Sequence, residues 1–554
     1  MRRMPGHGPL AGGARAQMRR AGGALGLVGA AFGLVAVATL ALMTLGLALL
    51  FLPRARRAGG VRVWRFGGAT RTPGAESAGA GHASSAARTA AGGPGARGEP
   101  AQPVDPGARP PEDETAASAG DAPGRERSWA EVIEAWPVAF LLAAALAAGA
   151  LAPAPARAKW LVPMDDAQTD HLKAYGLTYW VLEQGHKAEW LLNYRAGSFL
   201  LPDDPAIERQ ANVRGVTLEP MSGSGEAAMR ALIADNNMES IALEKAPKVA
   251  VYIPPNTPPW DDAVTLALDY AEIPYARIWD EEVLRGELPK YDWLHLHHED
   301  FTGQHGKFYG SYHTAAWYQE EERVQKAMAA RTGFAKVPQL KAAVAQAIKD
   351  YIGRGGFMFG MCSATDTYDM ALAAAGVDIA DVPYDGDPPD QEAQRKLDFA
   401  RTLAFKDFRL EMDPLLYKFS DIDVTLDADR RGPNSFFTLF DFSAKNDPVP
   451  TMLVQDHLNA VPEFLGQTTG FHREFLKSSA LVLGEVEGTD EVKYLHGQYG
   501  RGTFTFLGGH DPEDYQHRVG DPPTDLSKHK HSPGYRLILN NVLFPAAERK
   551  KQRT

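Results

Sequence analysis

The chain has 554 residues, a formal net charge of −11 at pH 7 and a single cysteine. One cysteine excludes an intrachain disulfide and any zinc or iron–sulfur site built from several thiolates. The acidic balance argues against a nucleic-acid partner, since such partners bind basic surfaces. At about 100–200 residues per domain, this length predicts more than one domain.

The first 158 residues differ in composition from the rest, because they contain arginine but no lysine. Residues 24–52 are uncharged, apolar and long enough to cross a bilayer, so they predict a transmembrane helix that contacts the membrane. Residues 53–135 are rich in Ala, Gly and Pro and contain few large apolar side chains. Such a composition cannot offset the entropy of ordering the chain, which predicts a disordered linker.

A second apolar run lies within residues 136–158. It is short for a spanning helix and suits the hydrophobic part of a signal peptide, with Ala156 and Ala158 as the small residues of a cleavage site before Lys159. A second membrane helix is the alternative interpretation. Residues 1–158 therefore predict a membrane or signal extension and a location in the cell envelope, which is either periplasmic, secreted or membrane-anchored.

Residues 159–245 predict a small α/β subdomain, because short apolar strands alternate with helical patterns. The expected strands are 160–164, 189–194 and 216–220, and the expected helices are 167–184, 204–213 and 224–236. A new series of elements begins with the apolar run after Pro247.

Residues 246–554 predict a larger α/β domain with insertions. Its apolar strands are continuous and bounded by turns, which favours a parallel sheet with helices on both faces. The expected strands are 248–253, 275–279, 292–298, 357–361, 481–484 and 502–507. The expected helices are 260–270, 314–331, 338–353, 366–375 and 533–543, and 381–450 is expected to form loops and antiparallel strands.

The single cysteine, Cys362, falls where the expected strand 357–361 turns into the helix 366–375. Backbone N–H groups at a helix N-terminus stabilise a thiolate or an oxyanion, which is the geometry of a nucleophile elbow. The alternative interpretation is a small buried hydrophobic residue.

A resemblance to a known family supports the elbow. The segment GGFMFGMCSATDT at 355–367 resembles the GGGF-x-G-x-H-S-A-T-D-T segment of the trehalose-utilisation (ThuA-like) proteins, which belong to the class I glutamine amidotransferase-like superfamily. Residues 288–294 and 499–510 resemble two further motifs of that family in the same order. The resemblance implies a flavodoxin-like parallel sheet with helices on both faces.

The resemblance also implies roles for individual residues. Cys362 would be the nucleophile, His510 the general base, and Glu513 or Asp511 the carboxylate that orients it. Apart from the resemblance, Ser363, Thr365 and Asp366 are expected to be binding residues, since they neighbour Cys362 in the elbow. The ThuA-like proteins carry His at the position of Cys362, so a binding site without a thiol nucleophile is the alternative.

The stretch 159–554 as a whole resembles exported bacterial proteins that are labelled asparagine synthetase B. True asparagine synthetases use an N-terminal Cys and an SGGxDS-type ATP loop. The chain contains neither feature, since it begins Met-Arg and the expected mature start is Lys159. Synthetase activity is therefore not expected from this resemblance.

A histidine-rich segment suggests a second kind of chemistry. On a strand, His295, His297 and Glu299 would share one face. Imidazoles with a carboxylate suit Zn²⁺ or a similar divalent ion at the carboxyl end of a parallel strand. The alternative interpretation is that these histidines bind no metal and only form hydrogen bonds at the polar end of the sheet. Nearby aromatic residues predict either core or a sugar-stacking pocket: Phe308, Tyr309, Tyr312, Trp317 and Tyr318.

The leading hypothesis is an exported or membrane-tethered hydrolase or acyl-transfer protein of the glutaminase or amidase type, acting through Cys362 and without a cofactor. Its substrate would be a small molecule or a carbohydrate. One alternative is a non-enzymatic envelope protein that binds a carbohydrate or a small metabolite. The other is a metal-dependent hydrolase that uses His295, His297 and Glu299.

Overall fold

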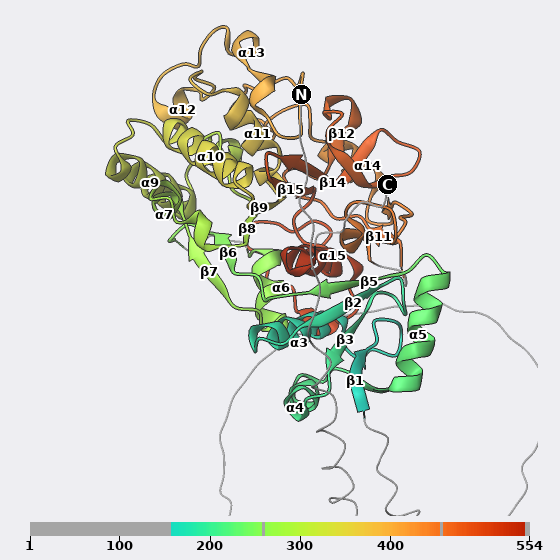
Figure 1. Cartoon of the computed structure of the whole chain (residues 1–554). Coiled ribbons are helices and arrows are strands. Elements are labelled where there is room, and N and C mark those ends of the chain that lie inside the picture. Colours follow the sequence, from blue (N-terminus) through green and yellow to red (C-terminus); the bar gives the residue numbers. More distant parts are fainter. Residues whose placement is uncertain (1–156, 257–260, 455–457, 549–554) are drawn as a thin grey trace, which may run out of the picture. The chain divides into compact units, whose positions relative to one another are not determined.

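Two β-sheets organise the part of the chain that the computed structural model describes, residues 157–256, 261–454 and 458–548 (Figure 1). All of these residues belong to one compact unit. The fold is mixed α/β and includes parallel strands, which confirms the expected fold class at this level.

The first sheet has five strands in the order β4-β1-β3-β2-β5, and every pairing in it is antiparallel. The strands are β1 (Arg157–Val162), β2 (Ala188–Leu192), β3 (Ser198–Pro202), β4 (Glu219–Ser222) and β5 (Glu239–Leu243). Its helices are α3 (His171–Glu183), α4 (Pro205–Arg214) and α5 (Gly223–Asp235). Asp170 begins α3 by accepting a hydrogen bond from the backbone N–H of Lys173.

The second sheet has ten strands, with β11-β10-β13-β14-β15-β9-β8-β6-β7 as its main path and β12 beside β14. Its parallel part is β15-β9-β8-β6-β7, and the remaining pairings are antiparallel. The strands are β6 (Val249–Tyr252), β7 (Tyr275–Ile278), β8 (Trp293–Leu296), β9 (Phe357–Met361), β10 (Phe436–Leu439), β11 (Ala460–Pro462), β12 (Phe471–His472), β13 (Leu481–Glu485), β14 (Glu491–Tyr499) and β15 (Gly502–Leu507).

Helices cover both faces of the parallel strands, because alternate strand residues enter two different cores. Phe357 and Phe359 of β9 share a core with α6 and α15, whereas Met358 shares another with α10 and α11. The helices are α6 (Ala263–Ala271), α7 (Asp280–Leu284), α8 (Tyr309–Tyr312), α9 (Ala316–Thr332), α10 (Val337–Gly353), α11 (Asp366–Ala373), α12 (Val382–Asp385), α13 (Ala393–Lys396), α14 (Thr425–Arg431) and α15 (Pro533–Leu543).

The expected assignment as a transmembrane protein is corrected by the structure. Among the described residues, no helix is both long enough and apolar enough to cross a membrane. The expected span 24–52, the linker 53–135 and the apolar run of 136–158 lie outside the described residues, which begin with β1 at Arg157.

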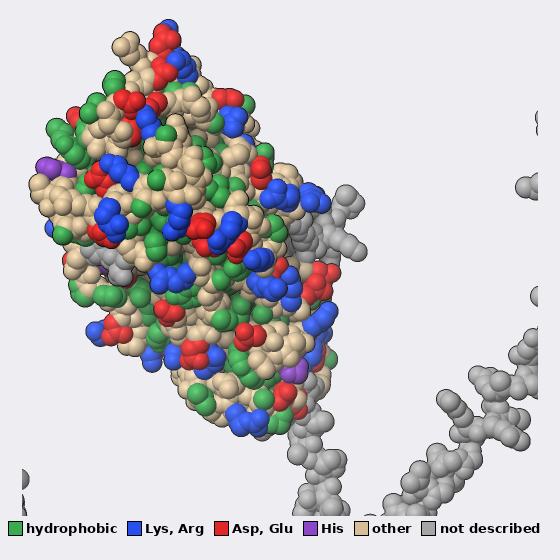
Figure 2. Space-filling model, turned by 90° about the vertical axis from the view of Figure 1, so that its left-hand side faces the viewer, with side chains coloured by type: hydrophobic (Ala, Val, Ile, Leu, Met, Phe, Trp, Pro, Cys, Tyr) green, Lys and Arg blue, Asp and Glu red, His purple; other side chains and the backbone are tan. Residues whose placement is uncertain are grey.

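Charged side chains are interspersed on the face of the molecule shown in Figure 2, where basic and acidic groups alternate rather than gather by sign. Ion pairs also join charged side chains of the described residues. Arg230, for example, binds both Glu189 and Glu226.

The segment 464–469 and the loop 508–510, which follows β15, pack against each other backbone to backbone. Gly509 N–H donates to the carbonyl of Thr468 (2.8 Å) and His510 N–H donates to that of Leu465 (2.9 Å). A Cβ on Gly508 would lie 2.2 Å from the Thr469 carbonyl oxygen, and Gly509 has φ +93°. Only glycine permits this approach without strain.

We therefore expect Gly508→Ala to destabilise the fold by roughly 1–3 kcal/mol or more, because the new methyl group meets a backbone oxygen. Gly223→Ala is the matched control, since no atom lies within 4 Å of a Cβ there. Urea denaturation followed by circular dichroism measures both. Equal midpoints for the two variants would contradict the close packing of these loops.

Candidate active site

Four parallel strands end at one edge of the second sheet, and polar residues follow each of them. Asp262 follows β6, His297 follows β8, Cys362 follows β9 and His510 follows β15. Parallel strands bring their carboxyl ends to the same edge, which is where ligands bind in open α/β sheets.

Cys362 lies in a strained turn between β9 and α11. The short 3-10 turn η3 (Cys362–Ala364) follows β9 directly, and Cys362 has φ +52°. A non-glycine residue in this left-handed conformation costs roughly 1–2 kcal/mol, and such strain gathers at functional sites. The Cys362 Sγ atom accepts a hydrogen bond from the backbone N–H of Gln467 (3.3 Å). The predicted strand–turn–helix context is therefore present.

The protonation of Cys362 differs from the expected thiolate. Burial raises the pKa of its thiol above the ordinary value of 9.0, and the backbone N–H groups of Gln467, Thr468 and Ser363 only partly offset this. The cysteine side chain is almost fully enclosed, at 2 % exposure. Desolvation destabilises the thiolate more than the backbone N–H groups of the turn stabilise it, so Cys362 is a neutral thiol in the free protein.

Ser363, Thr365 and Asp366 are buried, and the last two form side-chain hydrogen bonds at the elbow. Thr365 Oγ1 donates to the carbonyl of Cys362 (2.7 Å). Asp366 accepts from Thr468 Oγ1 (2.8 Å), and burial raises the pKa of its carboxyl to about 8. Of these three predicted binding residues, none lines the pocket that Cys362 lines. Asp366 connects the elbow to the segment that carries Gln467.

His510 lies near Cys362, but its ring contacts other groups. Its Nδ1 is 3.1 Å from His297 Nε2, and its Nε2 is 3.0 Å from the carbonyl oxygen of Asp261. Burial holds the pKa of His510 well below its usual range, so the ring is neutral. The structure brings His510 and Cys362 to one pocket without a direct hydrogen bond between them.

The two predicted orienting carboxylates have other partners than His510. Asp511 accepts a hydrogen bond from the Tyr535 hydroxyl (2.9 Å). Glu513 forms an ion pair with His529 (2.7 Å). The predicted triad of Cys362, His510 and an acid that follows it is therefore not assembled.

The histidines of β8 contact a carboxylate that the sequence reasoning missed. Asp262 Oδ2 is 3.5 Å from His295 Nε2, and Asp262 Oδ1 is 3.3 Å from His297 Nδ1. β8 ends at Leu296, so His297 and Glu299 do not share a strand face as predicted. The acidic partner of the two imidazoles is Asp262 and not Glu299.

Glu299 belongs to a separate buried ion-pair cluster. Its Oε1 is 2.5 Å from Lys341 Nζ, which is also 3.3 Å from Asp280 Oδ1. Burial opposes the charge on Lys341, but Asp280 and Glu299 outweigh it and raise the pKa of Lys341 to about 12. Glu299 thus neutralises a lysine inside the fold.

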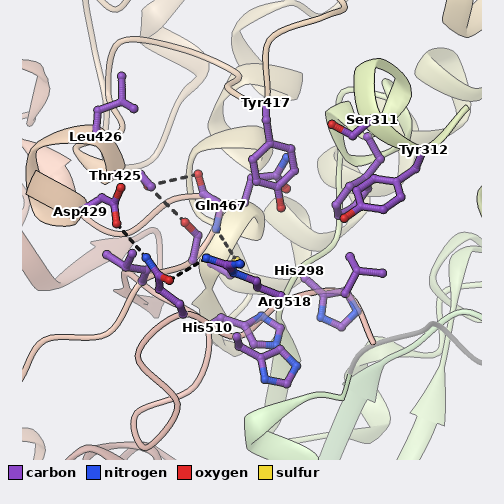
Figure 3. A pocket seen from close by; sticks show the side chains of 17 residues that line it. His298, Ser311, Tyr312, Tyr417, Thr425, Leu426, Asp429, Gln467, His510 and Arg518 are labelled. Atoms are coloured by element: carbon purple, nitrogen blue, oxygen red, sulfur yellow. Dashed lines mark hydrogen bonds between the residues drawn. The ribbon is translucent and has the colours of Figure 1, made fainter. Parts of the chain in front are cut away.

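The pocket beside Cys362 has a volume of about 430 Å³. Figure 3 shows Tyr312 and His298 on one side of it and Thr425 and Asp429 on the other. The remaining lining residues are Phe308, Ser311, Cys362, Tyr417, Leu426, Leu465, Gly466, Gln467, His510, Gln516, His517, Arg518 and Val519.

Two further lining residues were also missed by the sequence reasoning as site residues. Burial lowers the pKa of His298 to about 3, so this imidazole is neutral beside the pocket. His517 stacks on His510 with ring centroids 4.7 Å apart. A search of the residues that follow each parallel strand would have found Asp262 and His298, whereas nothing local in the sequence marks His517.

Comparisons with known proteins identify no family. No family model and no curated protein matches the chain. The cytoplasmic proteins STM3548 and STM1381 of Salmonella typhimurium match 55% and 56% of this chain and 100% and 92% of their own, at 13% and 14% identity and a TM-score of 0.27. A GH42 beta-galactosidase from G. stearothermophilus matches 56% of this chain and 31% of its own, at 11% identity and a TM-score of 0.21. At these TM-scores the likenesses support no argument about function.

The structural role of Glu299 can be tested through its lysine. We expect Lys341→Met to destabilise the fold by about 3–5 kcal/mol, because two buried carboxylates lose their cation. Lys326→Met on α9 is the matched control, since its ion pair with Glu322 is solvent-exposed and should change stability by under about 1 kcal/mol. Urea unfolding measures both, and a stable Lys341→Met protein would contradict this role.

The protonation of Cys362 predicts its alkylation profile. Because the pKa of the thiol is raised, iodoacetamide should modify the folded protein only at a pH above the range of free cysteine. The urea-unfolded chain, with the same single thiol, is the control and should react in the ordinary range. The raised pKa also favours the fold below the unfolded value, and this contribution is lost as the pH rises through the folded value. Faster alkylation of the folded form near neutral pH would contradict the buried neutral thiol.

Proposed function

We propose that the chain is a hydrolase or acyl-transfer enzyme in which Cys362 attacks an amide or ester carbonyl. The observation that carries this proposal is the left-handed conformation of Cys362 at the end of β9, next to a pocket. A strained turn that exposes a nucleophile above a sheet is the arrangement of nucleophile elbows in hydrolases. The residues of 355–367 that resemble the ThuA-like segment support the same assignment.

The finer fold belongs to the same proposal. We propose a flavodoxin-like core of the class I glutamine amidotransferase-like type for the parallel strands. The spatial order β7-β6-β8-β9-β15 supports it, because in chain order these strands read 2-1-3-4-5. The elbow then follows the fourth strand of this core and His510 follows the fifth.

The proposed reaction starts from a neutral thiol and a neutral imidazole. As Sγ attacks the carbonyl carbon, the thiol proton moves to an imidazole, and the carbon–nitrogen or carbon–oxygen bond then breaks. The leaving group takes the proton, and water hydrolyses the thioester to free Cys362. His298 is the proposed proton acceptor, because its ring is neutral and lines the pocket, whereas both ring nitrogens of His510 already face hydrogen-bond partners.

Backbone N–H groups at the elbow would stabilise the oxyanion. The N–H of Gln467 already donates to Sγ, and the N–H of Ser363 also stabilises negative charge on the sulfur. The N–H of Ala364 is not available in the same way, because it donates to the carbonyl of His297 (3.0 Å). Gln467 and Ser363 are therefore the proposed donors.

The walls of the pocket suit a substrate that is partly apolar and partly polar. Phe308, Tyr312 and Tyr417 supply aromatic surface, on which a sugar ring or an apolar acyl group can pack. Arg518 supplies a cation and donates to Gln516 (2.8 Å), which in turn donates to Asp429 (2.8 Å). We propose a small-molecule or carbohydrate-linked amide or ester as the substrate class.

The test is hydrolysis of a panel of amide, ester and glycan-linked substrates by the full chain. We expect Cys362→Ala to abolish turnover, and His298→Gln, which removes the proposed proton acceptor, to lower kcat by about 10²–10⁴-fold. His313→Gln is the control, since this histidine is exposed and lies outside the pocket.

Thermal unfolding of each variant separates loss of chemistry from loss of fold. Full turnover by a folded Cys362→Ala protein would overturn the proposal. Substrate binding without turnover in the unmodified chain would replace it with the non-enzymatic carbohydrate-binding alternative, which the aromatic wall of the pocket favours.

A further inference from the structure

We infer that Asp262, His295 and His297 form a binding site for a divalent transition metal, separate from the Cys362 pocket. One ligand atom from each residue lies within 4.8 Å of the others. His295 lies in β8 and His297 directly follows it, whereas Asp262 caps α6, the helix that follows the neighbouring parallel strand β6 in the chain. This site is independent of the proposed thiol chemistry and would stand if that chemistry failed.

The orientation of His295 exposes a nitrogen lone pair to Asp262. His295 Nδ1 lies 3.1 Å from the carbonyl oxygen of Phe359, and only a protonated nitrogen can face a carbonyl at this distance. In the neutral ring, Nε2 is then unprotonated, and it lies 3.5 Å from Asp262 Oδ2. Two hydrogen-bond acceptors therefore face each other, one fully buried and the other 9 % exposed. A cation between them resolves this repulsion.

The orientation of His297 follows from a second carbonyl. His510 Nε2 faces the Asp261 carbonyl oxygen and carries the proton, so in the neutral ring His510 Nδ1 accepts from His297 Nε2–H. His297 Nδ1 is then unprotonated in the neutral ring, and it lies 3.3 Å from Asp262 Oδ1. Two backbone carbonyls thus set the tautomers so that two lone pairs and a carboxylate converge.

These contacts have the form that metal-binding histidines adopt. A ligating imidazole commonly donates its second N–H to a backbone carbonyl or to another fixed acceptor, which holds the ring and raises its basicity. His295 does so through Phe359, and His297 does so through His510. His295 Nε2 and His297 Nδ1 have no hydrogen-bond partner among the described residues.

The separations fit an ion better than direct hydrogen bonds. Tetrahedral zinc with bonds of about 2.0–2.2 Å to nitrogen and oxygen places its ligand atoms about 3.3 Å apart. The observed separations are 3.3 Å and 3.5 Å. A charge-assisted hydrogen bond between imidazolium and carboxylate would be about 2.7–2.9 Å long.

The position in the fold also favours a ligand. The strand order reverses between β6 and β8, and ligands of open α/β sheets bind at such a switch point. A cavity of about 160 Å³ lined by Asp262, His297 and His298 opens beside the site. Three protein ligands and an adjoining cavity leave a coordination position for water or another small ligand.

Two imidazoles and one carboxylate select the class of metal. This donor set suits Zn²⁺, and with more open positions it also suits Fe²⁺, whereas Ca²⁺ and Mg²⁺ prefer oxygen ligands. The prediction is therefore one equivalent of a divalent transition metal per chain, with Ca²⁺ and Mg²⁺ unable to compete.

The test is metal content and metal titration of the full chain. Elemental analysis of the purified protein, followed by chelation and calorimetric titration with Zn²⁺ and Co²⁺, should give one site. Binding of Zn²⁺ should raise the Tm by mass action, and bound Co²⁺ should show visible d–d absorption.

Asp262→Asn is the most specific variant. Asp262 accepts hydrogen bonds from the first N–H groups of α6, and Asn can keep this helix cap while it loses the charge that binds the metal. Asp262→Asn and His295→Gln should each weaken Zn²⁺ binding by at least ~100-fold. This loss exceeds the one typical of residues that only hydrogen-bond to a metal ligand. His313→Gln and Glu299→Gln should retain full affinity. His295→Gln also checks the result if Asp262→Asn fails to fold.

Failure to bind one equivalent of Zn²⁺ or Co²⁺ would overturn the inference. Unchanged affinity in folded Asp262→Asn and His295→Gln proteins would also overturn it. A site lost in His298→Gln but kept in Asp262→Asn would assign the metal to the neighbouring group of His297, His298 and His510 instead. None of these readouts depends on turnover, so they are distinct from the test of Cys362.

Discussion

The backbone contact between the segment 464–469 and the loop 508–510 determines the geometry of the site. Hydrogen bonds from Gly509 to Thr468 and from His510 to Leu465 fix one loop against the other. As a result, the N–H of Gln467 meets Cys362 Sγ, and the ring of His510 lies at the same edge of the sheet. A larger side chain at Gly508 would separate these loops, so the proposed chemistry depends on a packing constraint at glycine.

Burial has different consequences for the polar groups at this edge. Lys341 with Glu299 and Asp280 forms a compensated cluster in which opposite charges meet directly. His295 and Asp262, in contrast, present acceptors to each other at a longer distance. The first arrangement is complete without a ligand, whereas the second is the one for which we infer a bound cation. Cys362 is a third case, because desolvation outweighs the hydrogen bonds from backbone N–H groups and keeps its thiol neutral.

Local patterns in the sequence predicted the regular elements of the large sheet well. The expected strand 502–507 and the expected helix 533–543 coincide with β15 and α15, because glycine and proline mark where these elements begin. The elbow at Cys362 was predicted for the same reason, since an apolar strand and a helix enclose it. The resemblance to amidotransferase-like proteins, by contrast, stays a prediction.

Contacts between distant segments could not be predicted in this way. The expected strand 292–298 ends early at Leu296, because the His297 carbonyl pairs with the turn at Ala364 instead of a neighbouring strand. Asp262 comes from the start of α6, and no local pattern connects it to His295. Glu513 follows His510 closely in the sequence, yet its side chain binds His529. The backbone N–H groups at the elbow do lower the pKa of Cys362, as the sequence predicted. Burial raises this pKa by more, and the depth of burial is set by contacts between distant segments.

The most direct test of the central claim is mass spectrometry of Cys362 during turnover. The full chain is mixed with p-nitrophenyl esters, quenched in acid within the first turnovers and mapped by peptide mass. The account predicts the mass of the acyl group on the peptide that contains Cys362, its removal by hydroxylamine, and its absence in Cys362→Ser. Consumption of the esters with Cys362 unmodified throughout would contradict it.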